Sequence, residues 1–207
     1  MMGRTLKAAY EDLFLIVGVS LVWWAGALLI LTAAPATRGL QAVANRLANY
    51  RRSSMDVFWE EARVRVGQSW LLTAGMIFIF AMIPVNIWFY SAGGALGWRS
   101  IVVVLWLWAL VLYGMVSQYL FPLLCQQSEP GVGLALRNAA LLAMRSPLYS
   151  LLGVLFQLLI VVLCFALVAP IIFLLPGLLA LANNFFLTGL LQEMGLADPP
   201  PVIEKRK

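Results

Sequence analysis

The chain has 207 residues, of which 63% are hydrophobic and only 11% are charged, and its formal net charge is +5. A soluble globular domain carries about 25% charged residues, so this composition excludes that class and predicts a polytopic membrane protein. The cations gather at the ends of apolar runs instead of on a polar domain, a distribution that argues against nucleic acid as a partner and indicates anionic lipid head groups.

The residue types that carry most catalysis and metal binding are scarce. There is no histidine, which is the commonest metal ligand and the usual general base. The two cysteines, Cys125 and Cys164, are 39 positions apart and show no paired spacing. We therefore expect no enzyme activity, no cofactor and no metal site.

The first uncharged run covers 13–34 and is long enough to cross a bilayer as a helix. Ala34-Pro35-Ala36 has the small-x-small look of a signal-peptide cleavage site, which is the alternative interpretation. However, a run of 22 residues exceeds the 7 to 15 of a signal-peptide core. Trp23 and Trp24 lie inside the run, where we expect them to pack against neighbouring helices.

Residues 35–69 hold six of the fourteen basic residues. The segment begins with an amphipathic pattern at helical spacing, which predicts a short helix in the membrane interface with Leu40, Val43, Ala44 and Leu47 on its apolar face and Arg38, Gln41, Asn45 and Arg46 elsewhere. Arg51 and Arg52 follow on a polar turn. The candidate lipid contacts are Arg46, Arg51 and Arg52.

Ser53 and Asp56 predict the start of a second amphipathic helix, with Phe58, Ala62, Val66 and Trp70 along one face and running directly into the next span. Glu61 and Arg65 stand at i and i+4 in the favourable order. Part of the segment matches the pattern by which permeases dock on their transport ATPase, although Arg63 and Ile79-Phe80 depart from it. The candidate partner-docking residues are Phe58, Glu61, Ala62 and Gly67.

Residues 70–90 and 101–120 predict two further spans joined by a glycine-rich external loop. Pro84 lies inside the first of them, where a proline serves either packing or a gate. Phe121-Pro122 is expected to close the second. Residues 134–144 then predict another interfacial amphipathic helix, which Pro147 ends.

Residues 150–191 are uncharged over 42 positions, twice what one crossing needs. We expect spans at 150–168 and 172–191 with a corner at Ala169-Pro170, or alternatively a re-entrant hairpin that does not cross. Pro176 would then lie in the opening turns of the last helix, where proline is tolerated. Residues 197–207 are expected to form a flexible cytoplasmic tail after a single membrane domain over 1–196.

The apolar runs contain a small set of amide side chains, Asn86, Gln118, Gln157, Asn183 and Asn184. Amides in membrane helices usually bond between helices, each for about 0.6 kcal/mol. The alternative is that they line a path for a polar substrate. A transporter coupled to protons or ions normally keeps an ionisable residue in the membrane, and these runs have none.

The distribution of basic residues predicts the orientation. Eleven of the fourteen fall in the first loop, the second amphipathic loop and the tail, which places these three segments in the cytoplasm. We therefore expect the N-terminus outside and the C-terminus in the cytoplasm.

Several segments resemble the YesL family of bacterial integral membrane proteins, a domain of unknown function. The matching segments are Leu21-Val22-Trp23-Trp24, Ala34-Pro35-Ala36-Thr37 with Leu40, Phe58-Trp59, Phe121-Pro122-Leu123-Leu124 and Leu136-Arg137-Asn138-Ala139. The resemblance spans about 10–195. It implies a location in the bacterial inner (plasma) membrane and an accessory or permease-like role in carbohydrate use, with no activity to carry over. The chain departs from the family's usual asparagine at Val22 and its usual glycine at Ala34.

The predicted fold class is all-α, a polytopic transmembrane bundle of about five spans with two cytoplasmic interfacial helices. Two functions remain open. One is a transport-associated component for carbohydrate, and the other is a structural or assembly subunit of a larger membrane complex. Both predict other membrane protein subunits as partners.

Overall fold

The computed structural model describes residues 5, 10–92, 97–127 and 131–197. Within these residues the chain is helical and contains no strand, so the all-α prediction is confirmed. The helices are α2 (Leu13–Leu28), α3 (Ala33–Ala48), α4 (Met55–Arg63), α5 (Val66–Ser91), α6 (Trp98–Gln126), α7 (Val132–Arg145), α8 (Pro147–Leu167), α9 (Ala169–Phe173) and α10 (Leu175–Glu193). Most of the predicted tail, from residue 198 on, lies outside the described residues.

Four helices are long and apolar enough to cross a membrane: α5, α6, α8 and α10, with 26, 29, 21 and 19 residues. At 1.5 Å per residue each reaches about 28 Å or more, close to the roughly 30 Å of a hydrocarbon core. The chain is therefore an integral membrane protein. The structure contains no membrane, so the orientation stays a prediction.

The helix predicted over 13–34 ends at Leu28, so its 16 residues span only about 24 Å. The chain turns after the helix at Ile30, which has a positive φ of 52°. A hydrogen bond holds the end of the helix, because Thr32 Oγ1 donates to the Gly26 carbonyl at 2.8 Å. The indole of Trp70 donates to the Leu31 carbonyl at 3.1 Å. These bonds satisfy one carbonyl in the last turns of the helix and one in the turn that follows it, as is required of backbone in an apolar environment.

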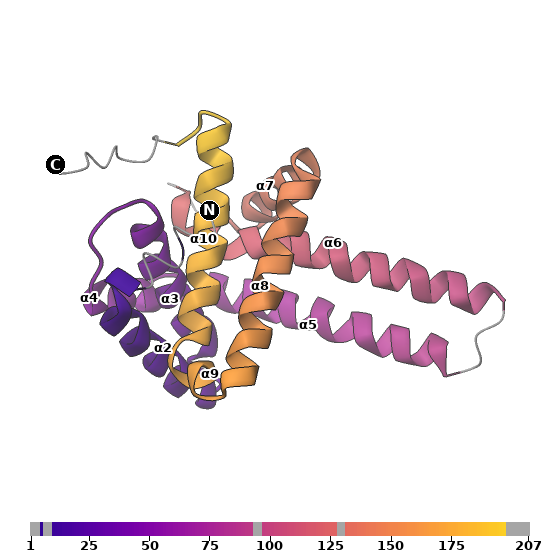
Figure 1. Cartoon of the computed structure of the whole chain (residues 1–207), viewed down its shortest axis with the longest axis horizontal. Coiled ribbons are helices and arrows are strands. Elements are labelled where there is room, and N and C mark those ends of the chain that lie inside the picture. Colours follow the sequence, from indigo (N-terminus) through magenta and orange to yellow (C-terminus); the bar gives the residue numbers. More distant parts are fainter. Residues whose placement is uncertain (1–4, 6–9, 93–96, 128–130, 198–207) are drawn as a thin grey trace.

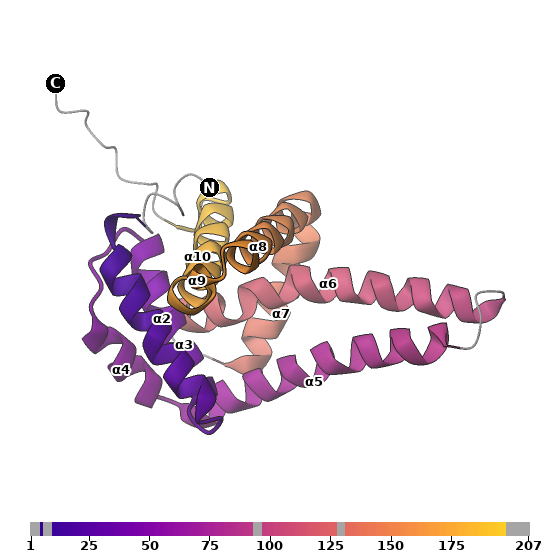
Figure 2. The same cartoon turned by 60° about the horizontal axis from the view of Figure 1, so that its bottom comes forward.

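Helices α5 and α6 form a long hairpin that projects from the rest of the molecule (Figure 1). We call it the arm. In both cartoon views the arm runs along the longest axis, while α8 and α10 run across it (Figures 1 and 2). The two helix pairs are therefore strongly inclined to each other. The remaining helices gather at the base of the arm, and we call this part the body.

The prediction that Phe121-Pro122 closes the third span is wrong, because α6 continues to Gln126. A proline in a helix removes one backbone hydrogen bond. Here Pro122 and its neighbours Phe121, Leu123 and Leu124 are all buried, and this packing holds the last turns helical. Helix α5 likewise continues through Pro84.

The chain turns one residue before the predicted corner at Ala169-Pro170: Val168 has a φ of 56° and separates α8 from the short α9, which begins at Ala169. Pro176 lies at the first turn of α10, as predicted, and Pro147 opens α8 in the same way. Helix α9 packs beside α2, where the Trp24 indole donates to the Ile171 carbonyl at 3.3 Å.

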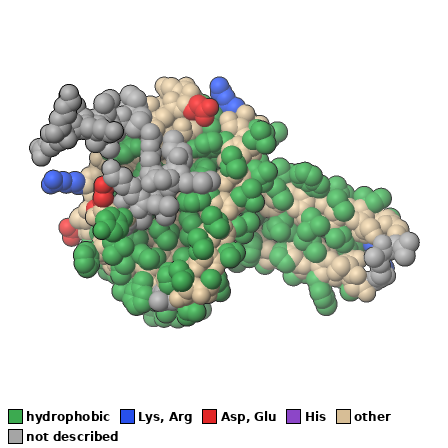
Figure 3. Space-filling view, in the orientation of Figure 1, with side chains coloured by type: hydrophobic (Ala, Val, Ile, Leu, Met, Phe, Trp, Pro, Cys, Tyr) green, Lys and Arg blue, Asp and Glu red, His purple; other side chains and the backbone are tan. Residues whose placement is uncertain are grey.

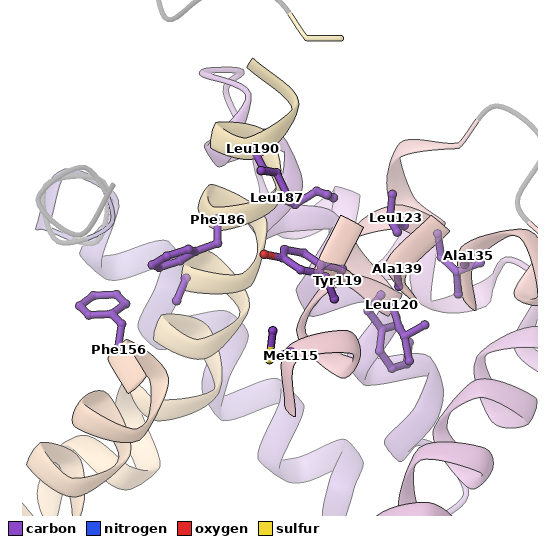
Figure 4. Close-up of a cluster of buried hydrophobic side chains, with 14 of the residues drawn as sticks. Met115, Tyr119, Leu120, Leu123, Ala135, Ala139, Phe156, Phe186, Leu187 and Leu190 are labelled. Atoms are coloured by element: carbon purple, nitrogen blue, oxygen red, sulfur yellow. The ribbon is translucent and has the colours of Figure 1, made fainter. Parts of the chain in front are cut away.

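Helix α10 is the centre of the body and packs against α2, α3, α6 and α8. One of its sides contributes Phe186, Leu187 and Leu190 to a cluster with residues of α6, α7 and α8 (Figure 4). Another side contributes Ala180, Leu181 and Phe185 to a cluster with α2, α3 and α4. Helix α10 therefore joins the two halves of the body.

Candidate functional site

The buried amides of the body form two hydrogen-bonded groups. In the first, Gln118 of α6 is 3% exposed, and its Nε2 donates to the Ser150 carbonyl at 2.9 Å. Its Oε1 accepts from Gln157 Nε2 at 2.9 Å, and Tyr119 Oη lies 3.0 Å from Ser150 Oγ. This group links α6 to α8. Gly153 allows the close approach, because a Cβ there would lie 2.5 Å from Gln118 Oε1.

The second group links α3 to α10. Asn184 Nδ2 donates to Gln41 Oε1 at 2.7 Å, and Asn184 Oδ1 accepts from Asn45 Nδ2 at 3.0 Å. Asn49 Nδ2 in turn donates to the Asn45 carbonyl at 2.9 Å. Asn184 is completely buried, so these bonds replace its lost contacts with water. The interhelical bonding expected for such amides is present at Gln118, Gln157 and Asn184.

The other two amides of the predicted set behave differently. Asn86 donates from Nδ2 to the Met82 carbonyl of its own helix at 2.8 Å. Asn183 Oδ1 and Thr188 Oγ1, both on α10, are buried and have no hydrogen-bond partner in the part of the chain that the structure describes. The five amides are thus dispersed over four helices, α5, α6, α8 and α10, and the structure does not bring them together into one site.

Helices α3 and α4 are held together by an ion pair that sequence reasoning missed. Arg38 of α3 is only 4% exposed, and its Nε lies 3.4 Å from Glu61 Oε2 of α4. The pattern had placed Arg38 and Gln41 on the polar face of an interfacial helix, and this is wrong because both are buried under α4 and α10. The acidic residues of the α4 segment, Asp56, Glu60 and Glu61, were the available signal, but the sequence alone does not show which of them faces Arg38.

The structure places the predicted docking residues on different surfaces. Phe58 and Ala62 face inward: Phe58 has no exposed surface, and a Cβ on Gly39 would lie 2.6 Å from its carbonyl oxygen. Glu61 is engaged by Arg38. Gly67 is exposed, and a Cβ there would meet nothing within 4 Å. Phe58 and Ala62 therefore serve the packing of α3 on α4, and only Gly67 offers free surface.

The continuous face predicted from Phe58 to Trp70 is also wrong. Helix α4 ends at Arg63, Arg65 takes a left-handed conformation with φ of 51°, and α5 starts at Val66. The turn places Val66 on the surface while Phe58 remains buried. Helix α4 is thus a separate element packed on α3, and the break at Val64 and Arg65 separates it from the arm.

The predicted lipid contacts Arg46, Arg51 and Arg52 are all exposed, at the end of α3 and on the turn after it. Anionic lipid as their partner stays a prediction. Ser54 beside them and Ser91 at the tip of the arm are exposed as well. These two positions report the orientation of the chain.

We expect Ser54→Cys, in a chain whose two native cysteines are replaced by alanine, to react with a membrane-impermeant maleimide only after the cells are permeabilised. Ser91→Cys should react in intact cells, because the arm would carry it across the bilayer. Mass-shift gels measure both. Labelling of Ser54→Cys in intact cells would overturn the orientation drawn from the basic residues.

The surface of the arm is the largest feature that the body leaves open. Only 11% of the most apolar stretch of α5 and 6% of that of α6 is buried, against 67% for α10. In the space-filling view apolar side chains cover the visible length of the arm (Figure 3). Such an extensive bare apolar surface must be covered by lipid or by another protein.

Aromatic side chains mark both ends of the arm. Tyr90 packs edge-on against Trp98 at the tip, with ring centroids 6.0 Å apart, and the Arg99 guanidinium lies 6.0 Å from the Trp98 ring. Trp70 precedes Tyr90 by twenty residues, or about 30 Å of helix. This is the thickness of a hydrocarbon core flanked by its aromatic belts. The arm therefore has the dimensions of a membrane-crossing hairpin.

Trp108 departs from this pattern. It follows Trp98 by ten residues, which places it about 15 Å further along α6 and near the middle of such a core. It is 63% exposed, unlike Trp23, whose indole donates to Thr37 Oγ1 at 3.0 Å. An outward-facing tryptophan at mid-depth is far from the belts where lipid-exposed tryptophans gather.

Comparison with known proteins adds no relative: no family model, no curated protein and no solved structure matches the chain. Among the described residues, no group of three or more histidine, cysteine, aspartate or glutamate side chains lies together. The arm surface centred on Trp108 and the buried amides of the body are therefore the candidate functional features.

Proposed function

We propose that this integral membrane protein is a non-enzymatic accessory subunit that joins a larger membrane assembly through its arm. The observation that carries the proposal is Trp108, a large aromatic side chain exposed near the middle of a membrane-length helix. The proposal corresponds to the assembly subunit that the sequence left open, and the absence of histidine from the chain is in keeping with it.

Physical reasons favour a protein partner over lipid at this position. The indole N–H is a donor, and acyl chains offer it no acceptor. A partner helix supplies both packing surface and carbonyl or side-chain acceptors. Tryptophan is also among the residues that contribute most to binding when a partner covers them. The neighbouring side chains Ile101, Leu105 and Leu112 are exposed at helical spacing and extend the surface around Trp108.

Replacement of Trp108 by leucine tests the proposal. Leucine keeps the position apolar, so insertion and folding should be unchanged, but the indole is lost. We expect the affinity for the partner subunit to fall about thirtyfold, equivalent to about 2 kcal/mol. The measurement is the amount of each membrane protein recovered with the tagged chain in mild detergent, by quantitative mass spectrometry.

Trp88→Leu is the matched control, because Trp88 is equally exposed on the arm but lies near the tip, in the expected aromatic belt. Recovery of partners should be unchanged in this variant. If the chain with Trp108→Leu recovers every partner at the parental level, the assembly role of the arm is wrong.

A transport-associated role in carbohydrate use is the second candidate, and one observation favours it. Asn183 Oδ1 and Thr188 Oγ1 are buried acceptors on α10 that have no partner within the described residues. Amide and hydroxyl groups of this kind bind the hydroxyls of sugars. The resemblance to the YesL family points the same way. Under this candidate Asn183→Leu would lower sugar uptake by the cells, whereas the assembly role predicts no such change.

A further inference from the structure

A second open feature lies in the body, where α2, α3, α4 and the start of α5 meet. It is a pocket of about 540 Å³, within the range of about 300 to 1,000 Å³ typical of small-molecule sites. The lining is almost wholly apolar and includes Val22, Ala25, Leu29, Phe58, Trp59 and Val66. The pocket exists because α2 ends at Leu28 and the chain turns before α3 begins.

The mouth of the pocket lies beside bare apolar surface. Leu28, Leu29, Ile30 and Leu31 form the turn after α2, and each is between 69% and 80% exposed. Four consecutive exposed side chains of this type belong in lipid. Leu29 and Leu31 also line the pocket, so the surface that meets acyl chains continues into it.

One charged side chain lines the pocket. Arg63, at the C-terminal end of α4, is exposed and has no ion-pair partner among the described residues. The pocket thus combines an apolar interior with a cation that an anion can reach, which is the arrangement that matches an anionic lipid: the chain inside and the phosphate at the guanidinium.

We propose that this pocket binds one acyl chain of an anionic phospholipid, with Arg63 holding the head-group phosphate. The charge selects the occupant, because an uncharged lipid or an apolar peptide would leave Arg63 without a counter-ion. The pocket is separate from the arm, so lipid binding and partner binding can be lost independently.

Native mass spectrometry of the full chain in mild detergent tests the proposal, with phosphatidylglycerol and phosphatidylcholine of identical acyl chains as probes. The parent chain should bind one phosphatidylglycerol about fivefold more tightly than phosphatidylcholine, the effect expected of one arginine near an anionic head group. Arg63→Gln should remove this preference. Arg145→Gln, at an exposed arginine of α7 outside the pocket, should keep it.

Substitutions that fill the pocket test whether it holds the acyl chain. Ala25→Phe should weaken binding of both lipids tenfold or more, because the new ring occupies the space. Ala81→Phe places the same ring on an exposed position of α5 away from the pocket and should change nothing. If Ala25→Phe does not fold, Val66→Phe fills the pocket from α5. The proposal is overturned if a folded pocket-filling variant binds lipid with the affinity of the parent chain. It is also overturned if Arg63→Gln keeps the full preference for phosphatidylglycerol over phosphatidylcholine. Loss of a co-purifying protein with lipid binding intact would overturn it too, because the occupant would then be a peptide.

Discussion

Glu61→Gln should lower the free energy of unfolding by about 3 kcal/mol. Its partner Arg38 is 4% exposed and cannot regain water when the carboxylate is lost. Breaking a buried pair from one side typically costs about 3 to 5 kcal/mol, because it leaves an uncompensated buried charge. The lower end applies here, since the Glu61 side chain is itself 35% exposed. Titration with denaturing detergent, followed by tryptophan fluorescence, measures the change.

Glu60 provides the matched control, because it is the neighbouring acidic residue and is exposed. Glu60→Gln should change the free energy of unfolding by no more than about 0.5 kcal/mol. Adding Arg38→Met to Glu61→Gln should recover most of the lost free energy of unfolding, since an apolar side chain of similar length replaces the unpaired charge. An unchanged stability in Glu61→Gln alone would show that the pair does not hold α4 on α3.

Gly39→Ala should destabilise the chain by about 3 kcal/mol, at the upper end of the cost of overpacking. A Cβ at this position would lie 2.6 Å from the Phe58 carbonyl oxygen and 3.0 Å from the Phe58 ring. The first contact is with backbone, so a rotamer change cannot relieve it and α4 as a whole must move away from α3. The same detergent titration gives the value.

Gly75→Ala is the control for this substitution. Gly75 lies within α5, and a Cβ there would meet nothing within 4 Å. The change should therefore be neutral or stabilising by up to about 1 kcal/mol, the gain in helix propensity. Equal effects of the two substitutions would contradict the close approach of α3 and α4.

The membrane helices could be predicted from the sequence because length and hydropathy alone decide them. Residues 70–90 fall within α5, and residues 150–168 match α8 to within one residue of its end. The last predicted span, 172–191, begins in α9 and crosses the break at Leu174 before it continues as α10. The predicted length of the first helix, 13–34, is wrong because hydropathy does not report a turn made by leucine and isoleucine. The Leu28–Leu31 segment is as apolar as the helix before it, and contacts from Thr32 and from the distant Trp70 end that helix.

The burial of α3 could not be predicted because it depends on partners far along the chain. Arg38 pairs through its Nε with Glu61, and the Gln41 side chain accepts from Asn184, which lies 143 positions away. A helical wheel contains neither partner, so both residues were assigned to a solvated face. For the same reason the sequence pattern does not distinguish a docking surface from the packing of Phe58 and Ala62 on α3.

The candidate site was predictable in part. The five amides could be selected by residue type, but their pairing depends on how the helices cross. Trp108 was visible in the sequence as a tryptophan deep in an apolar run, yet its outward direction follows only from the way α6 packs on α5. The pocket near Arg63 left no local signal, because its walls come from four separate helices.

Photo-cross-linking from position 108 tests the assembly role of the arm most directly. A benzoylphenylalanine introduced in place of Trp108 reports what covers that surface in the intact membrane. We predict a discrete adduct with one membrane protein at position 108 and none at position 88, where the same probe serves as control. If the probe at position 108 forms no protein adduct and reacts only with lipid, as at position 88, the assembly role of the arm is contradicted.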